Sequence, residues 1–362
     1  MIPISRPVLG FREWRAVTRV LASGSLAQGK EVARFEEAFS DKLLEGRPTV
    51  AVNSGTSGLH LGLLASGLEE GDEVIVPAFT FAATANSIVL AGGTPVWCDI
   101  SYDSFCIDPD QVESLVTPRT RAIMVVHMFG QPAPMEKILE IARRRNLTIF
   151  EDCAQAHGAK VGFRNVGTFG DWSMFSFYAT KNMTTGEGGV VGFASESQAA
   201  TARTLRSQGM DRAYHNSLVG FNLRMTEIQG ALGYAQLHRL DQLTRLRRRN
   251  ADFFNRRIEL PTIPAVIDGT THVYHQYTIR IPEDRDGFVA ALEKEHGIRA
   301  GVYYPVPLNE LESFRKHRGA SNLLETNRAC SEVVSLPVHP SLSLRNLRTI
   351  SRAVNRLSQA GG

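Results

Sequence analysis

The chain has 362 residues, which exceeds the usual extent of one hydrophobic core, so we expect a large domain joined to a smaller one. Lys and Arg (40) nearly balance Asp and Glu (37), and the net charge of +3 gives no support to nucleic acid or an acidic membrane surface as the main partner. The four Cys residues form no CxxC pair and no metal-ligand spacing, which indicates reduced thiols in a cytoplasmic chain and predicts no metal site.

The N-terminal region predicts neither a signal peptide nor a membrane anchor. MIPISRPVLGFREW contains two Pro and two Arg and no apolar run. Residues 74–98 contain no charge and are long enough to cross a bilayer, but Pro77, Gly92, Gly93 and Pro95 interrupt them. We interpret this stretch as a buried strand, a short buried helix and a second buried strand, and we expect no membrane partner.

Short Val- and Ile-rich runs alternate with helical segments from residue 50 to about 195. They are continuously apolar, which is typical of strands that helices cover on both faces. The runs lie at 50–55, 73–77, 94–100, 122–130, 147–153, 172–178 and 189–193. The pattern predicts an α/β fold with a mainly parallel sheet.

One long amphipathic helix is expected after this region. Residues 226–229 (TEIQ) fit a capping box, and apolar residues then recur at helical spacing as far as Leu246. Arg245 and the arginines at 247–249 lie near the end of this helix, where we expect a solvated face supported by the helix dipole.

The remaining chain predicts a smaller α+β domain. We expect a strand over 273–281, a helix over 286–297, an extended Pro-containing stretch over 300–308 and a terminal helix over 343–358. The expected division is a large domain at 1–245 and a small domain at 246–362, with the first 20 residues free to pack on the small domain.

Two charged residues stand out chemically. Asp152 closes the run LTIFEDC at the carboxyl end of a buried strand, where α/β sheets bind ligands, and a carboxylate buried there needs a cationic partner. Lys181 follows Phe175, Phe177 and Tyr178, and desolvation by such neighbours lowers the pKa of an amine so that it acts as nucleophile or base. Taken alone, Asp152 could be a structural Asp at a strand end, and Lys181 could be an ordinary surface Lys.

A third feature is the segment NSGTSGLHLGLL, residues 53–64. Gly55, Thr56 and Ser57 precede an apolar-periodic run, so free N–H groups and a hydroxyl meet the positive end of a helix. This favours a phosphate site, and the alternative is a plain N-cap. The three features together match the needs of pyridoxal phosphate (PLP): a lysine for the Schiff base, an acid for the pyridine nitrogen and a phosphate cradle.

At this point the sequence resembles the DegT-type sugar aminotransferases, which are PLP-dependent enzymes of fold type I in the aspartate aminotransferase superfamily. The resemblance runs nearly end to end, and its blocks occur in the family's order. They are SGSLAQGKEVARFEEAF (23–39), VNSGTSGLHLGL (52–63), VPAFTFAATANSI (76–88), FEDCAQAHGA (150–159), MFSFYATKNMTTGEGG (174–189), GFNLRMTEIQGALG (220–233) and VYYPVPL (302–308). It implies a seven-stranded, mainly parallel sheet in the large domain.

The resemblance also implies residue roles. Lys181 would bind the cofactor covalently and shuttle the proton, and Asp152 would pair with the pyridine nitrogen. Gln155 would lie near the phenolic oxygen, and Phe81 would stack on the ring. The phosphate would contact Gly55, Thr56 and Ser176.

Other implied roles concern the dimer and the substrate. Asn222 would reach the phosphate of the neighbouring subunit's cofactor, which makes the active unit a homodimer. Tyr303, Tyr304 and Asn309 would lie near the substrate. Asn309 and Gln208 stand where the family often has His, so the identity of the substrate stays open.

The purely structural alternatives to these roles are that Phe81 is a core residue, that Gln155 is a hydrogen-bonded interior group and that Asn222 caps the start of a helix. Glu187 is expected to be a surface turn residue without a catalytic role, and His127 and Cys153 are expected to be packing residues. No His/Cys/Asp cluster of the sequence has metal-ligand spacing.

The expected activity is a ping-pong transamination. An amino acid, L-glutamate by resemblance, would give its amino group to a nucleotide-linked keto-deoxyhexose. Three alternatives remain. The first is a PLP-dependent dehydratase, which Lys181 disfavours because those relatives carry His at this position. The others are a PLP-dependent enzyme that acts on a cyclic ketone of inosose or aminoshikimate type and a non-catalytic regulator with the same fold.

Overall fold

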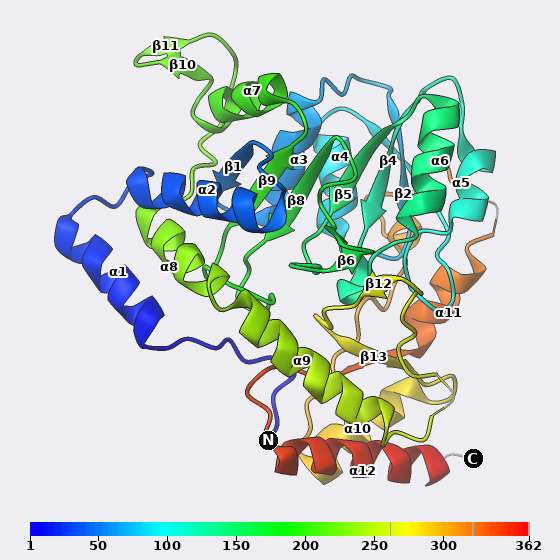
Figure 1. Ribbon diagram of the computed structural model, residues 1–362. Coiled ribbons are helices and arrows are strands. Elements are labelled where there is room, and N and C mark those ends of the chain that lie inside the picture. Colours follow the sequence, from blue (N-terminus) through cyan, green and yellow to red (C-terminus); the bar gives the residue numbers. More distant parts are fainter. Residues whose placement is uncertain (261, 321, 361–362) are drawn as a thin grey trace.

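The computed structural model describes residues 1–260, 262–320 and 322–360 and is organised around one large sheet (Figure 1). The strand order in this seven-stranded sheet is β1-β9-β8-β5-β4-β2-β3, and every neighbouring pair is parallel except those that involve β9. The strands are β1 (Thr49–Val52), β2 (Glu73–Pro77), β3 (Thr94–Cys98), β4 (Thr120–Val126), β5 (Thr148–Asp152), β8 (Trp172–Ser176) and β9 (Gly189–Phe193). The expected mainly parallel α/β architecture is confirmed.

Helices cover both faces of the sheet, which explains why the strands are continuously apolar. In β2, Val74 and Val76 pack into the core on one face and Ile75 into the core on the other. One face is covered by α3 (Gly55–Ala65), α4 (Ala82–Leu90) and α7 (Glu196–Arg206). The opposite face is covered by α2 (Lys30–Leu43), α5 (Pro109–Leu115), α6 (Met135–Arg145) and α8 (Glu227–Leu237).

The uncharged stretch at 74–98 folds as β2, α4 and β3, as the sequence predicts. All five residues of β2 are buried. In the part of the chain that the structure describes, no helix is both long enough and apolar enough to traverse a bilayer.

The expected single helix after Thr226 is wrong, because the structure has two helices, α8 and α9 (Leu240–Asn255). Thr226 forms the predicted capping box with Gln229. The break follows Leu237: the N–H of Arg239 donates to the carbonyl of Gln236 rather than to a residue four positions back. Arg239 also pairs with Glu13 at 2.9 Å, which ties the break to the N-terminal region.

The arginine cluster at the end of this region is not uniformly solvated. Arg245, Arg248 and Arg249 are exposed as expected, but Arg247 is buried inside the protein with only 4% of its surface exposed. The helix turns this one position inward, toward the loop before β13.

The C-terminal part of the chain packs around its own core. It contains β13 (Tyr277–Arg280) paired antiparallel with β14 (Val333–Leu336), together with α10 (Arg285–His296) and α12 (Leu344–Ala360). Residues 273–276 and 281 of the expected strand are not part of β13, and α11 (Leu324–Glu332) has no counterpart in the sequence analysis. The stretch at 300–308 is extended and leads into the short helix η2 (Leu308–Glu310).

The N-terminus lies beside this C-terminal core in Figure 1. The N–H of Ile2 donates to the carbonyl of Gly297 at 2.7 Å, and the N–H of Arg299 donates to the carbonyl of Ile2 at 2.9 Å. Within α9, Leu240 belongs to the core under the sheet, whereas Phe254 belongs to the C-terminal core. The division at 245/246 falls between these two positions and stays a prediction.

The smaller elements are α1, the short 3-10 helix η1 and two small sheets, β10-β11 and β12-β6-β7. They are α1 (Phe11–Ser23), η1 (Met128–Gly130), β6 (Lys160–Val161), β7 (Arg164–Asn165), β10 (Met210–Arg212), β11 (His215–Asn216) and β12 (Thr270–Thr271). The β10–β11 hairpin stands away from the rest of the chain at the top of Figure 1.

Candidate active site

A cavity of about 380 Å³ opens where β1, β5 and β8 end at the same edge of the sheet. Parallel strands bring their carboxyl ends together, so residues far apart in sequence line one space. Of the residues singled out in the sequence, the cavity gathers Gly55, Thr56, Phe81, Asp152, Gln155, Ser176, Lys181, Tyr303 and Tyr304.

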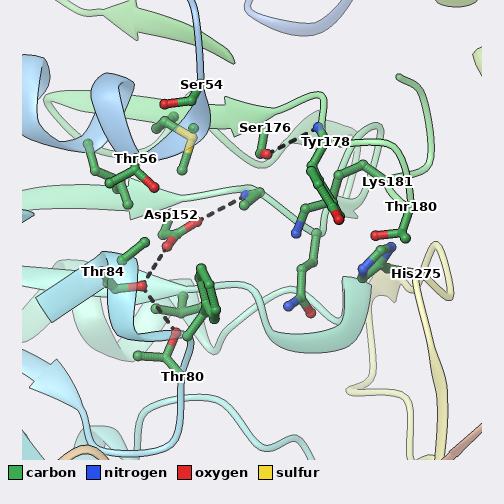
Figure 2. Close-up of a pocket in the computed structure, with 18 of the residues that line it drawn as sticks. Ser54, Thr56, Thr80, Thr84, Asp152, Ser176, Tyr178, Thr180, Lys181 and His275 are labelled. Carbon is green, nitrogen blue, oxygen red and sulfur yellow. Dashed lines mark hydrogen bonds between the residues drawn. The ribbon is translucent and has the colours of Figure 1, made fainter. Parts of the chain in front are cut away.

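Asp152 is the last residue of β5 and is buried with 5% of its surface exposed. Its Oδ2 accepts a hydrogen bond from the Thr84 hydroxyl at 2.9 Å, and its Oδ1 accepts one from the N–H of Ala154 at 3.0 Å (Figure 2). Burial raises the pKa of the carboxyl, while the two hydrogen bonds and the Lys181 charge oppose that rise. A cation placed in the cavity would therefore stabilise the ionised form of Asp152.

Lys181 lies across the cavity from Asp152 and Thr84 in Figure 2, after the turn that follows β8. Burial lowers the pKa of its amine to about 8, and the negative charge of Asp152 opposes this shift. A lysine with this pKa has a substantial neutral fraction near physiological pH, so it can act as a nucleophile or a base.

The start of α3 forms an anion cradle at another wall of the cavity. Ser54 caps the helix by accepting from the N–H of Ser57 at 3.1 Å. None of the hydrogen bonds among the described residues uses the N–H of Gly55 or Thr56, so both remain available at the positive helix end. A Cβ on Gly55 would lie 2.8 Å from the Cβ of Ser176, so only glycine lets the helix start this close to β8.

Aromatic and amide side chains form the remaining wall. Gln155 accepts from the N–H of Phe129 at 2.7 Å and donates to the Tyr304 hydroxyl at 3.1 Å. The Phe81 and Tyr304 rings are 6.0 Å apart between centroids, and Phe81 is 59% exposed. An exposed aromatic ring at a cavity mouth is not core packing, and it offers a flat surface to a planar ligand.

Two of the expected site residues do not line this cavity. Asn222 is exposed and pairs with Ser207 through the backbone, while Thr226 takes the role of helix cap. Asn309 lies in η2, and its Oδ1 is buried with no hydrogen-bond partner in the described chain.

Several lining residues were missed by sequence reasoning: Ser54, Thr80, Thr84, Thr180, His275 and Gln276. Thr84 shows best why such residues are missed. It lies in the block VPAFTFAATANSI, but its contact with Asp152 depends on the packing of α4 against β5. Glu187, expected as a surface turn residue, is exposed and also lines the cavity.

His127, Glu151 and Cys153 place one ligand-type atom each within 4.8 Å of one another, although the sequence shows no metal-ligand pattern for them. The donors and acceptors of His127 and Glu151 are already in use. His127 accepts from the N–H of Ala133 at Nδ1 and meets Glu151 at 3.1 Å through Nε2. Glu151 also accepts from the N–H groups of Gly167, Phe169 and Gly170. Burial raises the pKa of the Cys153 thiol well above its usual value, so this cluster is a satisfied interior network.

The residues around the cavity fit PLP. The cradle at Gly55, Thr56 and Ser176 suits its phosphate, and buried Asp152 suits a protonated ring nitrogen. Lys181 offers the amine for its aldehyde, and the 380 Å³ of space accommodates one planar heterocycle with room for a substrate.

The comparisons with known proteins agree with this geometry. The profile of the DegT/DnrJ/EryC1/StrS aminotransferase family matches residues 8–355. The chain is 39% identical to a "Pleiotropic regulatory protein" of Geobacillus stearothermophilus, over 91% of this chain and 89% of that protein. It is 38% identical to GDP-perosamine synthase of Caulobacter vibrioides, over 91% of this chain and 90% of the synthase.

Solved structures extend the likeness to three dimensions. The aminotransferase TlmJ from Streptoalloteichus hindustanus superposes with a TM-score of 0.94 at 32% identity and covers 99% of both chains. NtdA from Bacillus subtilis, solved with bound cofactor PMP, superposes with a TM-score of 0.89 at 30% identity and covers 96% of this chain and 81% of its own. The chain therefore belongs to the DegT/DnrJ/EryC1/StrS family and is a PLP-dependent aminotransferase of fold type I.

Proposed function

We propose that this aminotransferase moves an amino group from L-glutamate to a nucleotide-linked keto-deoxyhexose. The observation that carries the substrate class is the set of relatives: GDP-perosamine synthases of Caulobacter vibrioides (38% identity) and Escherichia coli (35%), and a UDP-N-acetyl-3-dehydro-glucosamine 3-aminotransferase of Acidithiobacillus ferrooxidans (36%). The proposal names neither the sugar nor the carbon that receives nitrogen.

The site residues have separate tasks in this proposal. When bound, PLP withdraws electrons from the α-carbon of the donor. Lys181 removes the proton from that carbon and later returns one, which its lowered pKa permits. Asp152 would hold the ring nitrogen protonated, and the exposed ring of Phe81 at the cavity mouth would pack against the cofactor.

A panel of ketones tests the substrate class. Purified enzyme is mixed with L-glutamate and either GDP- or UDP-linked keto-sugars or free cyclic ketones, and formation of 2-oxoglutarate is followed. We expect turnover with a nucleotide-linked sugar. Turnover restricted to an inosose or a shikimate-type ring would replace the proposal with the cyclic-ketone alternative.

Lys181→Ala tests whether the chain is catalytic at all, a question raised by the relative described as a regulatory protein. We expect loss of turnover together with loss of borohydride trapping of the cofactor. Normal turnover in this variant would show that Lys181 is not the reacting amine.

We further propose that the active unit is a cytoplasmic homodimer in which Asn222 of one subunit completes the site of the other. Asn222 is exposed and lies outside the cavity of its own chain. Tyr214 (98% exposed) and Val219 (92% exposed) present apolar surface on and beside the β10–β11 hairpin, which projects from the fold (Figure 1).

A complementation experiment tests this arrangement. Inactive Lys181→Ala and Asn222→Ala subunits are mixed, and exchange between dimers is allowed. If Asn222 acts across the interface, each mixed dimer regains one complete site, because both substitutions fall in the other one. No recovery of activity in verified mixed dimers would place Asn222 in the site of its own subunit or outside catalysis.

A further inference from the structure

Arg247 is a buried cation for which the described chain provides no carboxylate. The other two arginines with 5% or less of their surface exposed are paired: Arg206 with Glu36 at 2.8 Å and Arg280 with Glu332 at 2.9 Å. Arg247 makes no such pair among the described residues. A buried unpaired charge is costly, so this arginine calls for an anion that binds from outside the chain.

The hydrogen bonds of Arg247 hold one end of the guanidinium and leave the rest free. Its Nη1 donates to the carbonyl of His275 at 3.2 Å and, more weakly, to that of Tyr274 at 3.4 Å. Its Nε is buried without a partner in the described chain. Burial lowers the pKa of the group to about 10, so it stays charged at neutral pH. Nε and Nη2 form the edge that arginine uses to bind a carboxylate with two parallel hydrogen bonds.

Arg247 borders the active site. It lines two small pockets, of about 20 and 10 Å³. The first shares Thr180, His275, Gln276 and Tyr303 with the main cavity, and the second is lined by Lys181. Neither is lined by an Asp or Glu among the described residues, and the N-terminal residues 4–8 contribute to their walls. Burial lowers the pKa of the His275 imidazole well below its usual value, and the positive charges of Lys181 and Arg247 lower it further.

We propose that Arg247 binds a carboxylate of the amino-acid donor. The inference rests on the proposed aminotransfer from an amino acid, in which the donor nitrogen reacts beside Lys181. A carboxylate of that donor lies only a few bonds from the reacting nitrogen, and the pockets next to Thr180 and Lys181 are where such a group can reach.

The two half-reactions separate donor binding from acceptor binding. Arg247→Met, Arg247→Lys and the exposed neighbour Arg248→Met are compared by stopped-flow absorbance, first with L-glutamate on the PLP form and then with the keto-sugar on the PMP form. We expect Arg247→Met to weaken the apparent affinity for L-glutamate about ten- to a hundredfold, the effect of removing a hydrogen bond to a charged group. The acceptor half-reaction should be unchanged, Arg247→Lys should restore part of the affinity, and Arg248→Met should match the wild type.

Calorimetry with succinate, a dicarboxylate without an amino group, gives a readout that needs no turnover. The wild-type holoenzyme should bind succinate, and Arg247→Met should not. Equal losses in both half-reactions would show that Arg247 only holds the His275 loop and would overturn the proposal. Unchanged glutamate affinity or succinate binding in Arg247→Met would do the same. If succinate depends on Arg247 but no amino acid reacts, the proposed aminotransfer fails and the anion site stands.

Discussion

Replacing Thr84 by Val tests how the protein keeps Asp152 ionised. The two side chains are nearly isosteric, and Thr84 is 1% exposed, so the substitution removes one hydroxyl and little volume. That hydroxyl is one of two hydrogen-bond donors to the carboxylate within the described chain, the other being the N–H of Ala154. A hydrogen bond to a charged group contributes about 1.5–3 kcal/mol, and its loss leaves Oδ2 of a buried carboxylate without that donor.

The expected size follows from this energy. Loss of this donor should raise the pKa of Asp152 further, beyond the rise that burial already causes. We expect the rate of the L-glutamate half-reaction to fall roughly ten- to a hundredfold and PLP to be released more easily. Stopped-flow absorbance gives the rate, and cofactor fluorescence during dialysis gives the retention.

Two controls make the test specific. Thr84→Ser keeps a hydroxyl and should retain most activity. Thr80→Val removes a hydroxyl that contacts Thr84 at 3.2 Å but not Asp152, so its effect should be smaller. The reasoning is refuted if Thr84→Val matches the wild type, or if Thr80→Val and Thr84→Val lose equal activity.

Three further predictions concern the same fold. Gly55→Ala should lower PLP affinity, measured by equilibrium dialysis, because the added Cβ meets that of Ser176 at 2.8 Å; unchanged affinity would argue against the cradle. Because the pKa of Lys181 is lowered to about 8, the rate at which the apoenzyme captures PLP should rise with pH through a midpoint near 8 and level off above it. Asp152→Asn should move this midpoint to lower pH, because the lost negative charge favoured the protonated amine. A midpoint near 10 would contradict the burial effect. Glu73→Gln should reduce the free energy of unfolding in urea by about 1–3 kcal/mol. The reason is that the buried Glu73 carboxylate binds Arg119, Arg318 and Thr117. The partial solvent exposure of the two arginine side chains keeps the loss moderate. Exposed Glu69→Gln is the control.

The sequence was informative where chemistry is local. Strand positions follow from continuous apolar runs, the capping box at Thr226 from its own four residues, and the pairing of Asp152 with Lys181 in one cavity from the rule that parallel strands end at one edge. The family resemblance added Phe81, Gln155 and the two tyrosines, all of which line the cavity.

The features that were missed depend on tertiary contacts. His238 and Arg239 are acceptable helix residues, so nothing local announces the break between α8 and α9. Arg247 stands in a row of arginines that looks solvated, and only the packing of α9 turns it inward. Thr84 is an ordinary helix residue until the fold brings it to the carboxylate of Asp152.

The hydrogen bonds between Ile2 and residues 297 and 299 have a consequence for biosynthesis on the ribosome. The partner of the second residue of the chain emerges only after most of the protein has been translated. The N-terminal segment must therefore wait, undocked, while the sheet assembles, and its docking belongs to the late steps of folding. Because residues 4–8 help to wall the pockets beside Lys181, those pockets are completed only after this docking.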